Sequence, residues 1–156
     1  MEHSPIRPTN KGPAATFTGD VFVTPIAGPN ANSRLTAALV RFTPGARSNW
    51  HSHDAGQTLH GTDGVGLVVS RNGQVVGIRP GETVWTPPGE EHWHGATEHT
   101  LMAHYALLDV NEDGSDPTRW LEPVTDEQYR AALEAAQGGA DAAPTAVTSP
   151  ERRTSA

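Results

Sequence analysis

The sequence contains no cysteine in its 156 residues. This absence excludes disulfide bonds, thiolate metal sites and cysteine nucleophiles together. Long apolar runs are also missing: no stretch approaches the roughly 20 residues that a membrane-spanning helix needs. The N-terminus lacks the apolar core of a signal peptide as well. We therefore expect no membrane partner and a cytoplasmic location.

Positive charge is scarce. The formal net charge is −7 at pH 7, and the one basic cluster is the terminal stretch Glu151-Arg152-Arg153. A protein that binds DNA or RNA needs lysine and arginine side chains to neutralise phosphates, and no such footprint is present. We therefore expect no nucleic-acid partner, and a small-molecule substrate instead.

The chain length predicts one domain with polar ends. Residues 1–15 are rich in Pro, Ser, Thr and Asn and are predicted to form a flexible arm unless they dock on a neighbour. Residues 16–137 form the predicted globular domain. Residues 138–156 are dominated by Ala, Pro, Ser and Thr, which predicts a disordered tail because these residues cannot build a core.

Alternation of apolar and polar residues predicts a series of short β-strands separated by Gly, Pro and Asn turns. Pro25 is expected to stop the first strand, and Asn72-Gly73 predicts a type I′ hairpin turn. Near the end, Thr125 and Gln128 form a capping box that predicts a short helix ending near Gly138. With no helix between strands, the fold is predicted to be all-β, a sandwich or barrel. The expected strands cover residues 17–24, 35–42, 48–53, 57–62, 65–70, 74–76, 82–86, 91–96 and 100–108.

Four polar residues predict a metal site. His51 and His53 project from the same face of a strand, because side chains alternate with a period of two. Gln57 follows at the same parity, and His92 stands behind the turn Pro87-Pro88-Gly89. Three imidazoles and one amide oxygen suit a divalent transition metal with open coordination positions.

The spacing around these ligands is specific. One pattern is Gly-x5-His-x-His-x3-Gln-x6-Gly from Gly45 to Gly64, and the other is Gly-x5-Pro-x-Gly-x2-His from Gly81 to His92. Together they resemble the two motifs of the cupin superfamily, which implies a double-stranded β-helix, or jelly-roll barrel. Cupins usually carry Glu at the position of Gln57 and often Asn at the position of Ala96. The resulting neutral ligand set leaves the ion its full charge and makes it a stronger Lewis acid.

Two of the remaining histidines have two interpretations each. His94 shares the face of His92 and is either a buried, hydrogen-bonded residue or a direct participant. His104 lies on the otherwise apolar face of Met102, Ala106 and Leu108, and is either a satisfied core histidine or a base that faces substrate. By their parity and turn position, His60 and His99 are interpreted as non-catalytic.

A closer resemblance covers about residues 11–130. The runs 45–59, 88–96 and 120–129 are similar to a subgroup of small single-domain bacterial cupins that includes manganese-dependent hydroxynitrile lyases. These enzymes cleave (R)-mandelonitrile-type cyanohydrins to an aldehyde and cyanide. The resemblance implies a metal held by His51, His53, Gln57 and His92. It also implies an active site that contains the catalytic candidates His94, His104 and Ser48.

Some positions depart from that subgroup. Leu108 stands where Gln is expected and Glu91 where Lys is expected, while Ser48 replaces Thr and keeps the hydroxyl. His60-Gly61 replaces an apolar pair. The ligand set suits manganese first in view of the resemblance, and iron, nickel or zinc as alternatives.

Three functions remain open on the sequence. The leading hypothesis is metal-assisted cleavage of a cyanohydrin, with His104 as general base. The alternatives are a cupin dioxygenase or another metal-dependent lyase or isomerase acting on a small carbonyl compound, and a non-catalytic metabolite-binding cupin with a structural metal. The resemblance also implies a homodimer or homotetramer that pairs through N-terminal strands, with residues 17–24 as a candidate exchanged strand.

Overall fold

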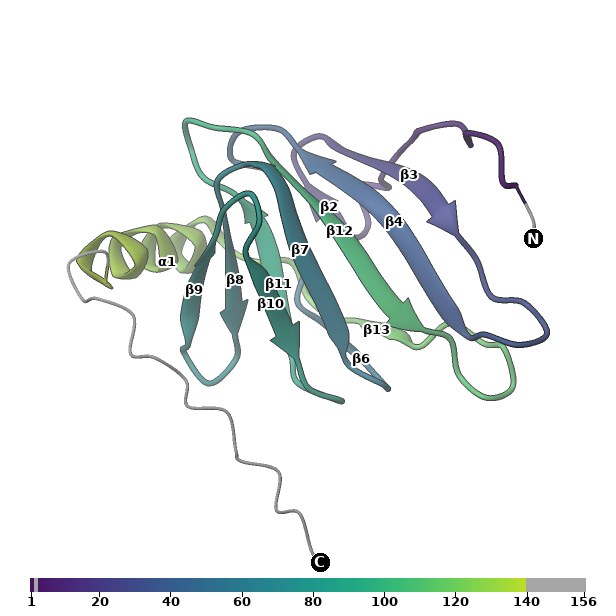
Figure 1. Ribbon diagram of the computed structural model, residues 1–156. Helices are drawn as coiled ribbons and strands as arrows, with labels where there is room; N and C mark the ends of the chain where they lie inside the picture. Colours follow the sequence, from purple (N-terminus) through teal and green to yellow (C-terminus); the bar gives the residue numbers. More distant parts are fainter. Residues whose placement is uncertain (2, 140–156) are drawn as a thin grey trace, which may run out of the picture.

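The computed structural model, which describes residues 1 and 3–139, consists of two antiparallel β-sheets and one helix (Figure 1). The helix, α1 (Asp126–Gly139), packs on the outer side of one sheet. The predicted all-β fold with a short C-terminal helix is therefore confirmed. In the described part of the chain, no helix is long and apolar enough to cross a bilayer.

Each sheet combines strands from distant parts of the sequence, as antiparallel barrels require. The first sheet has six strands, in the order β1 (Asn10–Lys11), β3 (Val21–Ala27), β4 (Leu35–Phe42), β12 (Met102–Asp109), β7 (Gln57–Gly64) and β10 (Thr83–Thr86). The second sheet has seven strands: β13 (Thr118–Trp120), β6 (His51–His53), β11 (His92–Ala96), β5 (Arg47–Ser48) and β2 (Phe17–Thr18), with β8 (Gly66–Ser70) beside β11 and β9 (Val75–Ile78) beside β8.

Two apolar clusters hold these layers together. The first lies between the sheets and includes Val40, Phe42 and Leu59. The second lies between the outer side of the second sheet and α1, where Trp93 is fully buried and packs near Tyr129. The inner faces of the two sheets thus bury each other, and α1 covers the outer face of the second sheet.

The helix begins as its sequence predicts. The backbone N–H of Thr125 donates to Gln128 Oε1 at 3.0 Å, and the N–H of Gln128 donates to Thr125 Oγ1 at 3.1 Å. This reciprocal pair confirms the capping box. The helix runs to Gly139, two residues into the segment expected to be the tail, and the rest of that segment, 140–156, lies outside the described residues.

The first predicted strand was wrong. Residues 17–24 do not form one strand, because Gly19 adopts a left-handed φ of 79° and sends the chain from the second sheet into the first. A Cβ at Gly19 would lie 2.8 Å from that of Ala46, so only glycine fits this crossing. Pro25 does not stop β3, which continues to Ala27 through an irregular register.

Two other local predictions need correction. The Asn72-Gly73 turn is not type I′, which requires positive φ at both residues. Gly73 alone has it, and its N–H donates to Ser70 O at 3.0 Å, giving a type I turn followed by a left-handed glycine. The predicted strand 48–53 is divided into β5 and β6, which pair with different residues of β11.

Part of the expected N-terminal arm is paired. Asn10 and Lys11 form β1, which runs antiparallel to β3, and the Lys11 ammonium lies 2.7 Å from the Asp20 carboxylate. The partners of β1 therefore belong to the same chain.

Candidate metal centre

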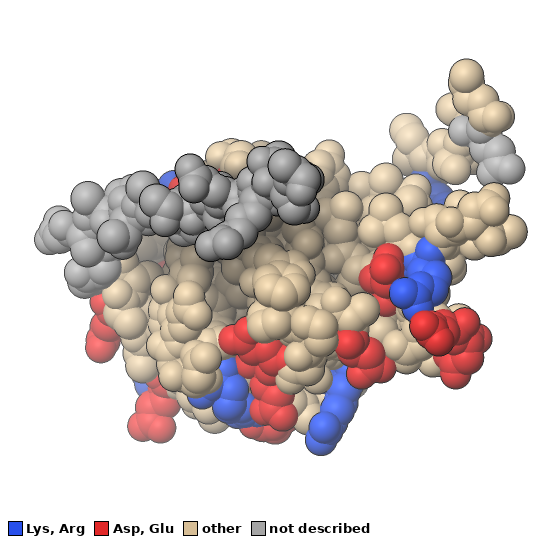
Figure 2. Space-filling model, turned by 60° about the horizontal axis from the view of Figure 1, so that its bottom comes forward, with Lys and Arg blue, Asp and Glu red and all other residues tan. Residues whose placement is uncertain are grey.

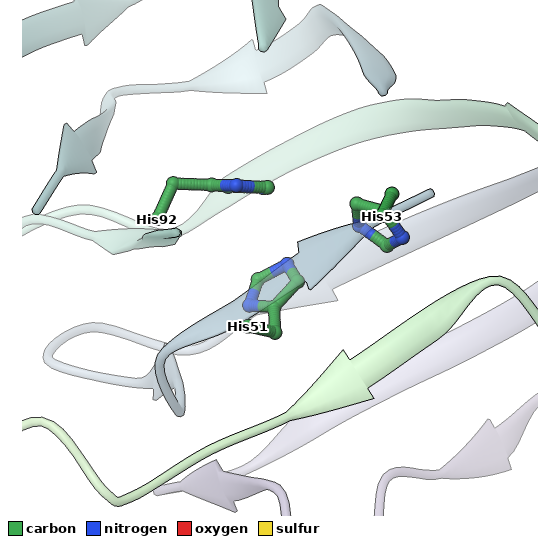
Figure 3. Close-up of side chains that lie close together, drawn as sticks. All are labelled: His51, His53 and His92. Atoms are coloured by element: carbon green, nitrogen blue, oxygen red, sulfur yellow. The ribbon is translucent and has the colours of Figure 1, made fainter. Parts of the chain in front are cut away.

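Three histidines meet between the sheets. β6 pairs antiparallel with β11 so that His51 lies opposite His92, and His53 projects from the same face two residues later. One ring nitrogen from each lies within 4.8 Å of the others, and all three side chains are buried (Figure 3). The arrangement could hold a metal ion.

Backbone carbonyl groups fix two of the three rings. His51 Nδ1 lies 2.9 Å from the carbonyl oxygen of Asn49, and His92 Nδ1 lies 2.9 Å from that of Glu90. A carbonyl oxygen only accepts, so Nδ1 carries the proton in both rings. The lone pair of each ring is therefore at Nε2, which is the tautomer that a metal ligand needs.

A threonine hydroxyl holds the third ring. Thr118 Oγ1 lies 3.2 Å from His53 Nδ1, and the N–H of Thr118 is itself fixed by Asp116 Oδ1 at 2.8 Å. His53 Nε2 is buried and has no hydrogen-bond partner in the described structure. Leaving a buried polar atom unpaired costs about 1–3 kcal/mol, which a coordinated ion would remove. These residues therefore fit a metal.

Burial keeps these imidazoles neutral. Loss of hydration lowers the pKa of His51 well below 6.5, and the neighbouring histidines lower it further. The same two causes lower the pKa of His53 to about 4, and burial lowers that of His92. Since only a neutral imidazole binds a metal, the site offers its lone pairs across the whole neutral range.

The fourth predicted ligand comes from the other sheet. Gln57, at the start of β7, is buried and places Oε1 3.2 Å from His92 Nε2. The structure therefore brings together all four residues that the sequence selected. Three nitrogens and one amide oxygen form a donor set without charge.

A second pair of histidines lies beside the first group. His104 Nε2, on β12, is 3.3 Å from His94 Nδ1, on β11, and the ring of Phe42 lies against both. His104 is fully buried, and its Nδ1 has no partner among the described residues. Burial lowers the pKa of His104 to about 4, and burial together with His104 lowers the pKa of His94 well below 6.5.

Ser48 reaches this pair through the backbone. Its Oγ accepts a hydrogen bond from the His94 N–H at 3.1 Å. The hydroxyl therefore lies beside His94, although Ser48 is at an even-numbered position and the ligands His51 and His53 are at odd-numbered ones. Asn49 is at an odd-numbered position, as the ligands are, but its side chain is not directed toward them. Its amide donates to Ala15 O at 2.9 Å. His60 pairs with Thr83, away from the ligand group.

Sequence reasoning missed Thr118 as a residue of the site, because it ends the polar stretch 111–118 that is typical of a loop, whereas the structure places it in β13 beside Trp120. Thr118 holds His53, and the Trp120 ring lies 4.9 Å from that of His51. Thr118 and Trp120 lie on the same face of β13, on either side of Arg119. A pattern of only three residues is too short to distinguish a strand from a loop in the sequence.

One cavity borders the candidate ligand set at Gln57 and is lined by none of the site histidines. It has a volume of about 200 Å³ and is lined by Leu108, Leu107 and Trp85. Leu108 therefore lies near Gln57, at a position where the resemblance implies an amide. Acidic and basic side chains are interspersed on the face shown in Figure 2.

The two facing sheets and the histidine group define a cupin. The model of the cupin domain family matches residues 38–111. The (R)-mandelonitrile lyase of Granulicella tundricola is 46% identical over 122 residues, which cover 78% of this chain and 92% of that protein. The chain belongs to the cupin family, and the predicted resemblance is confirmed.

Solved structures agree with this assignment. A cupin-like protein of Thermotoga maritima is 36% identical, covers 78% of this chain and 91% of its own, and superposes with a TM-score of 0.72. A cupin 2 conserved barrel domain protein from Rhodopseudomonas palustris is 16% identical, with coverage of 88% and 89% and a TM-score of 0.62. The latter shares the fold.

Proposed function

We propose that this protein is a metal-dependent lyase that cleaves a cyanohydrin to an aldehyde and cyanide. The observation that carries the proposal is the buried His94–His104 pair beside the three-histidine group. Similarity to a protein named as a lyase, over almost the whole length of that relative, supports it.

The ligands in this proposal are His51, His53, Gln57 and His92, and the ion is manganese, with iron, nickel and zinc as alternatives. A divalent ion held there would lower the pKa of a substrate hydroxyl bound to it. The unpaired Nε2 of His53 and the neutral donor set support this choice of residues.

His104 acts as the general base in this mechanism. Its Nδ1 is unpaired, and its lowered pKa keeps the ring unprotonated above about pH 4, so it can accept the hydroxyl proton. The oxygen lone pair then forms the carbonyl while the carbon–carbon bond breaks, and its electron pair leaves with cyanide. The proton passes from His104 to His94 and on to cyanide, so the reaction involves no net proton uptake and no redox step.

Ser48 positions His94 in this scheme. Its Oγ accepts from the His94 N–H and so fixes the start of that side chain relative to His104. Leu108 favours an apolar substituent on the substrate, because it lines the cavity beside Gln57.

The decisive experiment measures benzaldehyde release from racemic mandelonitrile by manganese-loaded protein at mildly acidic pH, where the spontaneous reaction is slow. Chelator-stripped protein is the background. His104→Ala is expected to lose most of the activity while keeping the metal, and His99→Ala, in an exposed turn, is the matched control.

Absence of release from metal-loaded protein would reject the lyase. Oxygen consumption by the iron-loaded protein would then favour the dioxygenase. Tight ligand binding without turnover would favour a metabolite-binding cupin.

A further inference from the structure

One arginine contacts the residues that immediately precede two of the candidate metal ligands. Arg71 follows β8, and its guanidinium carbon lies 3.9 Å from the centre of the Trp50 ring. Its Nε donates a hydrogen bond to Glu91 Oε2 at 2.9 Å. Trp50 precedes His51 and Glu91 precedes His92 in the sequence, so a single side chain contacts the neighbours of both ligands.

These contacts fall within the two short segments that orient the histidine rings. The carbonyl oxygen of Asn49 accepts from the ring of His51, and that of Glu90 accepts from the ring of His92. In each segment the carbonyl group and the ring belong to residues two positions apart. The residue that Arg71 contacts is the one between them in both cases.

Arg71 holds this region at further points. Its backbone N–H donates to the carbonyl oxygen of Glu91 at 2.8 Å, so Glu91 is held through both its backbone and its carboxylate. Its Nη1 lies 2.7 Å from Glu122 Oε1. The carbonyl oxygen of Glu122 in turn accepts from the Trp50 N–H at 3.1 Å. Arg71 thus joins three segments that are distant in sequence.

The strands that carry His51 and His92 are joined only briefly by their own backbones. β6 has three residues, and in the described structure its register with β11 consists of the single pair His51 and His92. Adjacent strands can differ in twist by about 10–35°. One residue pair leaves that angle undetermined, so contacts outside the pairing must fix it.

Given the metal site of the proposed function, on which this inference rests, we propose that Arg71 is a positioning residue for the metal ligands. By packing on Trp50 and binding Glu91, it sets the separation and the angle of the segments that carry His51 and His92. Trp50 belongs to the apolar cluster on the outer side of the second sheet. Arg71 therefore acts from the side of the sheet opposite the ligand rings.

The chemistry of arginine suits this role. A planar guanidinium group can donate in its plane to two carboxylates while its face packs on an aromatic ring. Lysine carries one compact charge and cannot make all three contacts together. The Arg71 side chain is 38% exposed, and exposed ion pairs contribute little to the free energy of unfolding. The effect of Arg71 is therefore expected in the geometry of the metal site more than in global stability.

Calorimetric titration of Mn²⁺ into chelator-treated, full-length protein measures the effect on binding. Arg71→Met keeps an unbranched apolar side chain and removes the guanidinium group. Its dissociation constant for Mn²⁺ is expected to rise about tenfold, the lower end of the range for groups that orient metal ligands. Arg71→Lys should recover part of this loss, because the ammonium group can still reach one carboxylate.

Arg34→Met is the matched control. It also removes an arginine with an exposed carboxylate partner, Glu112, at 3.8 Å, but this pair contacts none of the segments that carry the ligands. It should bind Mn²⁺ as the wild type does. Urea unfolding of the metal-free variants shows whether each one is folded.

A spectrum separates positioning from a general effect on folding. Co²⁺ bound in place of Mn²⁺ has visible absorption bands that depend on its coordination geometry. At saturating Co²⁺, Arg71→Met is expected to shift these bands, whereas Arg34→Met should reproduce the wild-type spectrum. Glu91→Gln keeps the shape of the side chain and removes its charge, so it should show a smaller shift and provides the test if Arg71→Met fails to fold.

The outcomes distinguish this inference from the proposed function. Failure of the wild type to bind Mn²⁺ would overturn both. Binding by the wild type with unchanged cobalt bands in folded Arg71→Met, or in Glu91→Gln where Arg71→Met does not fold, would overturn the positioning role alone. An equal loss of affinity in Arg34→Met would do the same, because the effect would not be specific to Arg71. None of these measurements uses turnover, so they hold whether or not the protein cleaves a cyanohydrin.

Discussion

Acidification should destabilise the metal-free protein through His104. Burial lowers the pKa of this side chain from 6.5 to about 4, so the folded state resists protonation where the unfolded chain accepts it. The contribution is absent above pH 6.5, grows as the pH falls, and levels off below about 4. One pH unit is worth about 1.36 kcal/mol, which gives about 3.4 kcal/mol in full and about 2 kcal/mol at pH 5.

Urea unfolding of chelator-treated full-length protein at pH 7.5 and pH 5.0, followed by tryptophan fluorescence, measures this loss. His104→Gln keeps a hydrogen-bonding group toward His94 but does not titrate. Its free energy of unfolding should fall between the two pH values by about 2 kcal/mol less than that of the wild type. Protein concentration is held constant, because an oligomer gains stability by mass action.

His99→Gln is the matched control, since this histidine is exposed in a turn, and it should follow the wild type at both pH values. The reasoning is refuted when His104→Gln loses as much free energy of unfolding on acidification as the wild type. That outcome would mean that His104 is protonated in the folded state at pH 5 and is more hydrated than its burial implies.

Four further outcomes follow from the site and its supports. Thr118→Val should weaken manganese binding about 10- to 100-fold in titration calorimetry, with Thr118→Ser restoring it, because the hydroxyl orients His53. Gln57→Glu should bind manganese more tightly yet release benzaldehyde about tenfold more slowly, since a carboxylate reduces the effective charge of the ion. Free manganese at 100 times its dissociation constant should stabilise the protein by about 2.7 kcal/mol, seen as a higher Tm than after chelation. Thr125→Ala should cost about 1 kcal/mol in urea unfolding at neutral pH, and an unchanged midpoint would show that the capping box contributes nothing.

Local patterns predicted the elements that depend on local causes. β4 occupies Leu35–Phe42 as predicted, because its alternation is regular and Pro44-Gly45 ends it. The capping box of α1 formed because Thr125 and Gln128 need only each other. The four candidate ligands converge because period-two alternation fixed which residues of β6 share a face, and the turn before His92 returns β11 beside β6.

The missed features depend on partners far away in the sequence. Gly19 resembles any glycine in a strand until Ala46 is placed against it. Thr118 enters the site only because β13 pairs with β6, 65 residues earlier in the chain. Ser48 acts on His94 through a backbone N–H, and side-chain parity carries no information about such a contact.

The three histidine rings differ in how they can change under mutation. His51 and His92 are oriented by carbonyl oxygens of Asn49 and Glu90, and every residue type that could replace those two has the same carbonyl. A point mutation at either position therefore keeps the carbonyl group that accepts from the ring. Among the three rings, His53 alone is oriented by a side-chain hydroxyl, so mutation of Thr118 can change the orientation of this one ligand. Natural variation or directed evolution can therefore adjust how the ion is coordinated at His53 while His51 and His92 keep their anchors.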